Sequence, residues 1–375
     1  MKVCVVNPFG YGLIEPRAVH DGARVFGGAE VQLQYLMSSL ARDDRFVVSM
    51  IVERPPGEMV ASVDGIRLIG ARPINARVAR ARERFPILWP SYAAAMYTAD
   101  ADVYVQRGGA VLTGEVGMFC RARRRRFAFI AAHDWDCDRH HLRGSGWLAG
   151  RFYASGLEHA DLVLAQSEWQ QQALAKHHGI RARRLRSGFP DAPVSGAARR
   201  HVLWVGRCVE WKRPLAFLEL AAAFPDVPFV AICPEYTNAS FLGRAVRVRA
   251  AALPNVELFG FVPFDATHAF FTEALMFVNT SHAEGFPNTF VQSARAGTPI
   301  VSWRTDPDGT LAAEYGGLLA DGDDGLMRRH VERLLTDDDL RRRLGEQSRS
   351  RFESEHELGS RVRELADALL DVSRG

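Results

Sequence analysis

The sequence predicts an α/β protein built from two doubly wound domains, each a parallel sheet covered by helices. Short runs of β-branched and apolar residues alternate with longer amphipathic segments along most of the chain, as in βαβ units. The length of 375 residues suits two domains better than one. The stretch 186–200 interrupts the alternation with Gly, Pro, Ser and Ala and no periodicity, a composition typical of a linker.

Strands and helices are expected on both sides of this linker. The expected strands before it are Lys2–Asn7, Phe46–Val52, Val103–Gln106, Phe127–Ala132 and Asp161–Ala165, and two helices are expected at Ala29–Leu40 and Glu168–His177. The expected strands after it are His201–Val205, Phe229–Cys233, Val256–Phe261, Leu275–Asn279 and Pro299–Trp303, followed by a charged helical segment, Leu340–Leu370. We therefore expect an N-terminal Rossmann-like domain (1–185), a hinge (186–200), a C-terminal Rossmann-like domain (201–350), and a final helix (351–375) that packs back on the N-terminal domain.

The composition is that of a soluble globular protein. Hydrophobic residues make up 47% and charged residues 24% of the chain, with a net charge of only +3. The cysteines are scattered, odd in number and without a CxxC pair, which favours a reducing compartment. No apolar run approaches the roughly 18 residues that span a bilayer, and the four apolar residues after Met1-Lys2 are too few for a signal peptide. We expect a cytoplasmic protein.

Residues that follow the strands are the first candidates for a site, because doubly wound sheets bind ligands beyond the carboxyl ends of their strands. After the first strand, a long loop closes on Gly27-Gly28 directly before a helix. Glycines there let backbone N–H groups approach an anion or a sugar hydroxyl closely. A flexible loop with a permissive helix start is the alternative.

The second candidate is His133, which follows a strongly apolar strand. The acidic alternation Asp134, Asp136 and Asp138 near it could indicate a metal site. The paired ligand spacings of zinc sites are lacking, however. The DWD triplet is weak evidence for a metal site, because a match of three residues has a high false-positive rate. A structural histidine stays the competing interpretation.

The third candidate pairs Arg207 with Lys212 in one short loop, where a strand ends and Pro214 opens a helix. Two cations beside a helix start suit a diphosphate, because arginine can grip two oxygens while lysine adds a mobile point charge. Two solvated surface charges are the alternative interpretation.

The fourth candidate is the loop that carries Glu284 between a buried strand and a short helix, which Gly297 closes. A carboxylate beside free helix N–H groups suits the hydroxyls of a sugar attached to a phosphate. Gln292 lies on the helix as a further ligand contact. Alternatively, Thr289 and Gln292 form a capping box.

Together these segments resemble the retaining glycosyltransferases of family four, which have the GT-B fold of two Rossmann-like domains facing a cleft. The matching pieces appear in the family's order across nearly the whole chain, and the segment from Glu284 to Val301 is the most specific. The pieces are Gly27-Gly28-Ala29-Glu30, His133-Asp134, Gly206-Arg207 with Lys212, Glu284-Gly285-Phe286-Pro287-Asn288-Thr289, and Ala296-Gly297-Thr298-Pro299-Ile300-Val301.

The resemblance implies transfer of a sugar from a nucleoside diphosphate to an acceptor hydroxyl, with retention of the anomeric configuration. It implies that Arg207 and Lys212 stabilise the departing diphosphate where other enzymes use a metal, so we expect no metal or other cofactor. It also implies that Glu284 lies at the donor sugar and that His133 positions that sugar. The other implied substrate contacts are Gly27, Gly28, Gly285, Phe286, Pro287, Asn288, Thr289 and Gln292.

Gln292 departs from the family, which has a second acidic residue at this position and uses it to bind the ribose. Glutamine keeps an acceptor oxygen but loses the charge that strengthens its hydrogen bonds. We expect a weaker or altered nucleotide contact. A silent sugar-nucleotide-binding protein stays an alternative, as does a phosphorylase or epimerase of the same fold.

The acceptor should be a sugar, a lipid-linked molecule or another small molecule, read by the loops Tyr11–Phe26 and Ile74–Tyr92. Arginines at helical spacing within 72–84, followed by apolar residues, suggest peripheral contact with the inner face of the membrane. For the run Arg121–Arg126 we favour a structural role over membrane contact: it precedes a strand, so its cations cap the C-terminus of a helix at the sheet edge opposite the ligand. The basic segments lack interleaved aromatics, so we expect no nucleic acid partner.

Overall fold

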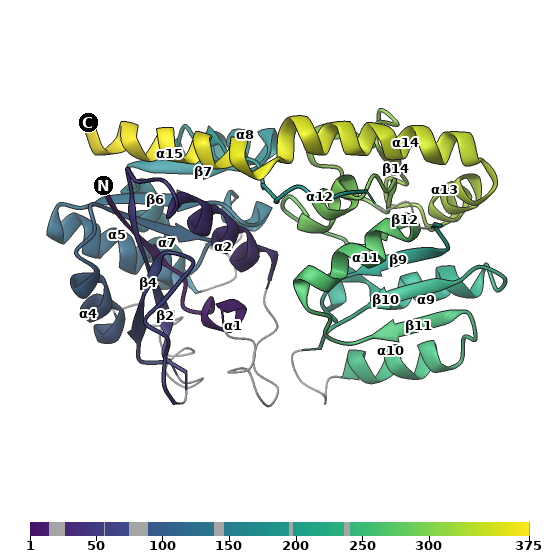
Figure 1. Ribbon diagram of the computed structural model, residues 1–375, viewed down its shortest axis with the longest axis horizontal. Coiled ribbons are helices and arrows are strands. Elements are labelled where there is room, and N and C mark those ends of the chain that lie inside the picture. Colours follow the sequence, from purple (N-terminus) through teal and green to yellow (C-terminus); the bar gives the residue numbers. More distant parts are fainter. Residues whose placement is uncertain are drawn as a thin grey trace. The chain divides into compact units, whose positions relative to one another are not determined.

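The computed structural model describes residues 1–14, 27–55, 57–74, 89–138, 146–194, 198–235 and 241–374. The chain divides into two compact units (Figure 1). Unit 1 contains the described residues up to Gly188 together with those from Leu358 onward, and unit 2 contains those from Phe189 to Glu357. The role of 186–200 as a hinge stays a prediction.

Unit 1 is built on an eight-stranded sheet in the order β3-β4-β2-β1-β5-β6-β7-β8. All neighbouring strands pair in parallel except β3 and β4, which are antiparallel. The strands are β1 (Lys2–Val6), β2 (Val47–Glu53), β3 (Ser62–Val63), β4 (Ile66–Ala71), β5 (Val103–Arg107), β6 (Arg126–Ile130), β7 (Leu162–Ala165) and β8 (Arg183–Arg184).

Helices cover the two faces of this sheet and bury a separate apolar cluster on each. Val105 belongs to the cluster under α2 and α15, whereas Tyr104, the residue before it, belongs to the cluster under α4, α5 and α7. This alternation is what a strand buried on both faces requires. The helices are α1 (Tyr11–Ile14), α2 (Gly28–Leu40), α4 (Pro90–Ala99), α5 (Val111–Arg123), α7 (Trp147–Glu158), α8 (Glu168–His178) and α15 (Leu358–Arg374).

Unit 2 has a six-stranded, fully parallel sheet in the order β11-β10-β9-β12-β13-β14. Its strands are β9 (His201–Val205), β10 (Phe229–Ile232), β11 (Val256–Phe259), β12 (Ala274–Asn279), β13 (Ile300–Ser302) and β14 (Gly317–Leu319). Its helices are α9 (Pro214–Ala222), α10 (Phe241–Ala251), α11 (Thr267–Thr272), α12 (Asn288–Arg295), α13 (Asp324–Thr336) and α14 (Asp338–Arg351).

The strand order reverses once in each sheet, between β1 and β5 in unit 1 and between β9 and β12 in unit 2. In a doubly wound sheet this reversal is the topological switch point, beyond which the ligand binds. Both units are therefore Rossmann-like, which confirms the predicted fold class. The same rule marks one ligand-binding edge in each unit.

The charged C-terminal segment is helical, as the sequence analysis expects, and it is divided into two helices. α14 ends at Arg351, a π-helical turn follows over Phe352–His356, and Glu357 is extended (φ −64°, ψ 128°) before α15 begins. α15 packs along α2 in unit 1 (Figure 1). At this break the chain passes from unit 2 to unit 1. Among the described residues, no helix combines the length and apolarity that crossing a bilayer requires.

Candidate functional site

The predicted donor-side residues of unit 2 follow the two strands that flank its switch point. Arg207 and Lys212 lie in the loop after β9, and Glu284 lies in the loop after β12. β9 and β12 pair in parallel, so their carboxyl ends lie side by side at one edge of the sheet. The strand order thus brings together loops that are far apart in the sequence.

Lys212 and Glu284 form an ion pair across these two loops. The Lys212 side chain is 16% exposed and that of Glu284 is 8% exposed, so both charges are largely removed from water. The interpretation of Lys212 as a solvated surface charge is therefore wrong. Glu284 does not project from the loop as a free carboxylate but faces the ammonium group.

A chain of hydrogen bonds holds the backbone of the loop that carries Lys212. The Trp204 indole donates to Thr280 Oγ1 (2.9 Å), and Thr280 Oγ1 donates in turn to the carbonyl oxygen of Lys212 (2.6 Å). The backbone N–H of His282 donates to the Trp211 carbonyl oxygen (2.8 Å). These bonds join the loop after β9 to the end of β12 and position the ammonium opposite Glu284.

Arg207 and Arg213 lie in the same loop but have different surroundings. The Arg207 guanidinium lies 5.7 Å from the centroid of the Trp211 ring. Arg213 adopts a left-handed conformation (φ 51°) just before α9. Its guanidinium stacks on Trp303 at 3.9 Å and donates to Asp324 (3.0 Å), so Arg213 serves the loop's own structure.

The loop after Glu284 leads into α12 without the predicted capping box. α12 begins at Asn288 with Pro287 as its N-cap, so Thr289 already lies inside the helix and cannot cap it. Phe286 is buried and its ring lies 5.1 Å from that of His356. Gly297 has φ 61° just after the helix end, which confirms its predicted role as a terminator.

Gln292 is buried on α12, with only 4% of its surface exposed. Its side-chain oxygen accepts a hydrogen bond from Thr267 Oγ1 (3.0 Å), and not from a backbone group of its own helix start. The capping-box interpretation is therefore wrong, because the partner comes from α11. A ribose contact through Gln292 stays a prediction.

The predicted residues His133, Gly27 and Gly28 belong to unit 1. His133 Nδ1 accepts a hydrogen bond from the backbone N–H of Trp135 (3.2 Å), and the two rings lie 4.3 Å apart. Gly27 precedes α2, and its N–H donates to Glu30 Oε2 (3.0 Å). Their meeting with the unit 2 residues around one substrate stays a prediction.

The DWD carboxylates that raised a metal alternative are engaged with the protein. Asp136 is buried, and its two oxygens accept from the backbone N–H groups of Gly109 (2.9 Å), Ala132 (2.8 Å) and His133 (2.9 Å). Asp134 accepts from the Gln170 amide (3.0 Å). Asp136 thus closes the turn after β6. Within the described ranges, no three His, Cys, Asp or Glu side chains are placed to hold a metal ion.

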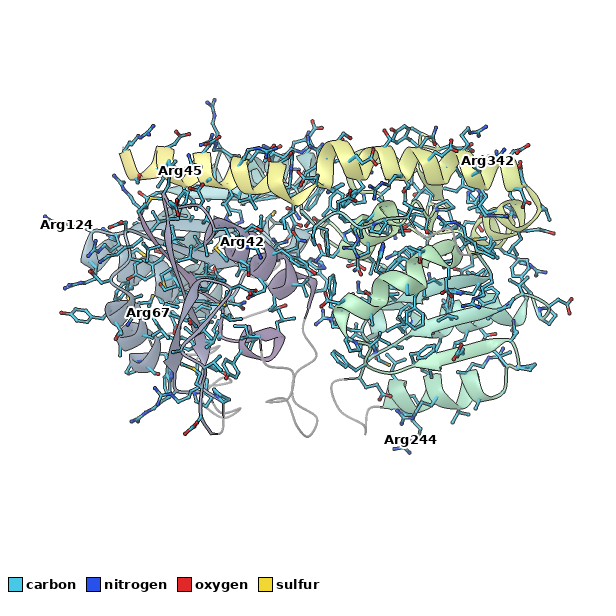
Figure 2. All side chains as sticks on the ribbon, in the orientation of Figure 1. Arg42, Arg45, Arg67, Arg124, Arg244 and Arg342 are labelled. Atoms are coloured by element: carbon cyan, nitrogen blue, oxygen red, sulfur yellow. The ribbon has the colours of Figure 1, made fainter. Side chains whose placement is uncertain are left out.

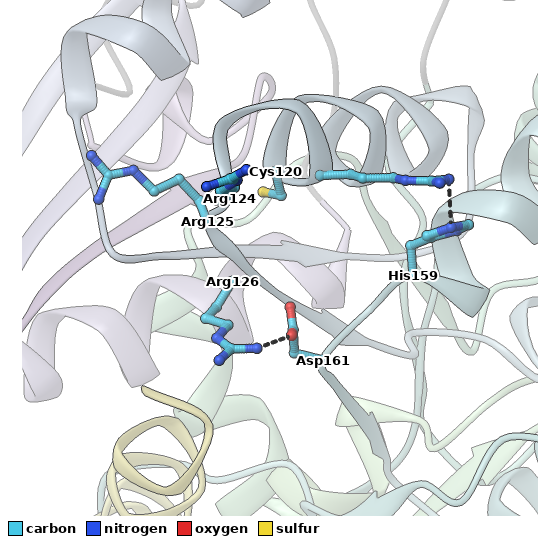
Figure 3. A pocket seen from close by; sticks show the side chains of 7 residues that line it. Cys120, Arg124, Arg125, Arg126, His159 and Asp161 are labelled. Carbon is cyan, nitrogen blue, oxygen red and sulfur yellow. Dashed lines mark hydrogen bonds and ion pairs between the residues drawn. The ribbon is translucent and has the colours of Figure 1, made fainter. Parts of the chain in front are cut away.

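The run Arg121–Arg126 lies where α5 ends and β6 begins, at the amino edge of the unit 1 sheet. Four of its arginines line a cavity of about 370 Å³ together with Cys120, His159 and Asp161 (Figure 3), namely Arg121, Arg124, Arg125 and Arg126. Arg126 donates to Asp161 (2.8 Å), and Arg121 donates to His159 Nε2 (2.8 Å). Arg121 and Arg123 lie in the last turn of α5 and Arg124 is its C-cap, which is the place that the helix-capping interpretation expects. The other basic segment falls largely on 75–88, outside the described residues, as does most of the acceptor loop 11–26.

Arg107, the last residue of β5, is a polar strand-end residue that the sequence analysis does not single out. It lies at the switch point of unit 1, because β5 pairs with β1. Burial lowers the pKa of its guanidinium to about 10. The expected strand stops at Gln106, so the strand-end rule itself would have identified Arg107.

Comparison with known proteins finds matches over part of the chain. Residues 199–337 match the family model "Glycosyl transferases group 1". The lipopolysaccharide core biosynthesis glycosyltransferase LpsE of Rhizobium meliloti (strain 1021) is 32% identical over 164 residues. That match covers 42% of this chain and 43% of LpsE, which is less than half of either protein.

Solved structures share the fold over nearly the full length. Sucrose-phosphate synthase from Thermosynechococcus elongatus superposes with a TM-score of 0.78 at 17% identity, covering 99% of both chains. Anabaena Alr3699/HepE, in complex with UDP and glucose, gives a TM-score of 0.71 at 16% identity, covering 99% of this chain and 100% of HepE. Residues 199–337 are thus similar to the group 1 glycosyl transferases, and the chain shares the GT-B fold with these solved structures.

Proposed function

We propose that this protein transfers a sugar from a nucleoside-diphosphate sugar to an acceptor hydroxyl with retention of the anomeric configuration. The observation that carries the proposal is the Lys212–Glu284 ion pair at the switch point of unit 2, with Arg207 in the same loop. UDP as the nucleotide is supported by the HepE complex with UDP and glucose. An acceptor in the lipopolysaccharide core or a related glycan is supported by the name of LpsE.

In this proposal the donor binds with its diphosphate at Arg207 and Lys212. The planar guanidinium contacts two phosphate oxygens, and the ammonium adds a single strong donor. Glu284 accepts hydrogen bonds from hydroxyl groups of the sugar. Because Lys212 and Glu284 already face each other, the sugar and its diphosphate would bind to opposite charges of a preformed pair.

Transfer breaks the bond between the anomeric carbon and the phosphate oxygen. Positive charge develops on the sugar ring and negative charge on the departing diphosphate, where Arg207 and Lys212 stabilise it. The acceptor hydroxyl attacks on the face that the diphosphate leaves, and a phosphate oxygen takes its proton. The products are the glycoside and the nucleoside diphosphate, and no metal is needed to balance the charge.

Unit 1 holds the acceptor in this proposal. His133 positions the donor sugar, and the N–H groups near Gly27 and Gly28 receive the donor or the acceptor. The segment 186–200 lets the two units close and exclude water, because hydrolysis of the donor competes with transfer. The basic segment within 72–84 brings the enzyme to the inner membrane face for a lipid-linked acceptor.

A panel of nucleotide sugars tests this proposal. We expect one UDP-sugar to raise the melting temperature most, because a ligand that binds only the native state stabilises it. Nuclear magnetic resonance of the product should show the donor's anomeric configuration, and addition of EDTA should leave the rate unchanged. Phosphate-dependent breakdown of a glycoside without transfer from any nucleotide sugar would replace the proposal with a phosphorylase. Binding of UDP without turnover would replace it with a silent binding protein.

A further inference from the structure

Arg107 places a cation at the ligand-binding edge of unit 1. It ends β5, and its Cα is in register with Ile130 of β6, while the preceding Gln106 is in register with Val6 of β1. β1 and β5 flank the switch point of this sheet. The strand-end rule that places the donor residues in unit 2 therefore places Arg107 where unit 1 binds a ligand.

Most of the hydrogen-bonding capacity of the Arg107 guanidinium is unused. Nη2 donates to Gln166 Oε1 (3.1 Å). Nε is fully buried without a hydrogen-bond partner, and within the described ranges Nη1 has none either. No carboxylate of the described chain lies within ion-pair distance of Arg107. A partly buried charged group in this state is costly to the fold unless a partner arrives.

Gln166 holds the Arg107 guanidinium in place, but its side chain has no further acceptor to offer the remaining N–H groups. Only 1% of Gln166 is exposed, and its side-chain nitrogen donates to the Ala131 carbonyl oxygen (2.8 Å). Its side-chain oxygen accepts from Ser187 Oγ (2.9 Å) as well as from Arg107. These hydrogen bonds of Gln166 hold the Arg107 side chain in one orientation, which reduces the conformational entropy that Arg107 loses when a ligand binds.

Glu30 and Asp136, the carboxylates that act electrostatically on Arg107, are hydrogen-bonded to backbone groups. Glu30 caps α2 through the N–H of Gly27, and Asp136 accepts three N–H groups after β6. They favour the charged form of Arg107, whereas burial, the larger effect, lowers its pKa to about 10. The guanidinium is therefore positively charged at neutral pH and is left without a direct counter-ion.

We propose that Arg107 binds an oxyanion on the acceptor, so that the acceptor substrate carries a phosphate or carboxylate group. A guanidinium with free N–H groups matches the two oxygens of such an anion and gains little from a neutral hydroxyl. The inference rests on the proposed function, because it names the class of acceptor for that reaction. It needs only residues of unit 1.

Calorimetric titration with three sugar probes tests this inference. Glucose, glucose 6-phosphate and glucuronate differ in whether they carry an anion and in which one, and saturating UDP keeps them away from Arg207 and Lys212. We expect the wild-type protein to bind one of the two anionic sugars about 10- to 100-fold more tightly than glucose. The stronger of the two identifies phosphate or carboxylate as the recognised group.

Three variants separate Arg107 from general charge effects. Arg107→Gln should remove the preference for the anionic sugar, and Arg107→Lys should keep part of it, because the charge remains but the planar fork is lost. Arg124→Gln is the matched control, because Arg124 is an exposed arginine near the opposite edge of the same sheet (Figures 2 and 3). The preference of Arg124→Gln for the anionic sugar should equal that of the wild type. Thermal unfolding verifies that each variant folds.

Equal binding of all three sugars by the wild type would overturn the inference, as would a preference that survives in Arg107→Gln. The proposed function is judged separately by titration with UDP alone, which depends on unit 2. Absence of UDP binding would remove the proposed function, and the difference between the wild type and Arg107→Gln would still report on Arg107. Normal UDP binding with no anion preference would remove the inference alone.

Discussion

The Lys212 ammonium donates to the Glu284 carboxylate and so joins two loops 72 positions apart in the sequence. Both loops leave strands that flank the switch point of unit 2, and both side chains are largely buried. Because the two charges are held together before a ligand binds, the Lys212 cation that would bind a phosphate lies beside the Glu284 carboxylate that would accept hydrogen bonds from sugar hydroxyls. The predictions that follow depend on this pair.

Replacing Glu284 should separate catalysis from nucleotide binding. Glu284→Gln should lower turnover by more than about 100-fold, because the neutral amide accepts weaker hydrogen bonds from the sugar hydroxyls than the carboxylate does. Its affinity for UDP should stay equal or rise, since Lys212 loses its competing carboxylate. Steady-state kinetics and calorimetry measure the two effects. Glu219→Gln, which alters a more exposed glutamate paired with Arg249, is the control, and turnover of Glu284→Gln close to the wild-type value would contradict the assignment.

Arg207 and Lys212 should recognise the diphosphate and not the nucleoside. Arg207→Gln and Lys212→Gln should each weaken UDP binding by about 10- to 100-fold and leave uridine binding unchanged. Arg213→Gln lies in the same loop but should change UDP affinity little, because its guanidinium stacks on Trp303. Calorimetry with UDP and uridine provides the comparison. Equal losses for both ligands, or a larger loss in Arg213→Gln, would count against the diphosphate site.

Gln292→Glu tests the predicted ribose contact. The carboxylate can still accept the hydrogen bond from Thr267 and would offer a stronger acceptor to a ribose hydroxyl. We expect UDP to bind several-fold more tightly, roughly the gain of one charge-assisted hydrogen bond, and 2′-deoxy-UDP or 3′-deoxy-UDP to lose that gain. Identical gains for UDP and both deoxynucleotides would show that position 292 acts elsewhere.

Unit 2 should lose stability as the pH falls below about 6.5, the ordinary pKa of histidine. Burial lowers the pKa of His201, His268 and His330. In the unfolded chain these groups bind protons first, so the stability present above pH 6.5 is lost progressively toward their lower folded values. Denaturant titrations between pH 8 and pH 5.5 measure the slope. His201→Gln should flatten it, and a slope unchanged in this variant would contradict the argument.

Local pattern in the sequence predicts the strands and the loops that bear the site. β9, β12 and α12 appear where apolar runs and the glycine at 297 indicate them. Gly27-Gly28 stand at the start of α2 and Arg207 lies just after β9, as expected. These features depend on neighbours in the chain, and a single sequence carries that information directly.

Contacts between distant segments account for what the sequence leaves out. Gln292 meets Thr267 of α11 because two helices pack, and Lys212 meets Glu284 because β9 and β12 are neighbours in the sheet. The π-helical turn that breaks the C-terminal segment has no signal in its charged composition. The strands β3, β4, β8 and β14 are also missing from the expected strands.

A crystal structure of the protein with bound UDP tests the central claim most directly. We predict diphosphate oxygens within hydrogen-bonding distance of Arg207 and of Lys212, with the Glu284 carboxylate facing the space next to the terminal phosphate. A diphosphate bound at any other strand end, or at the arginine-lined cavity beside β6, would contradict the assignment of this site.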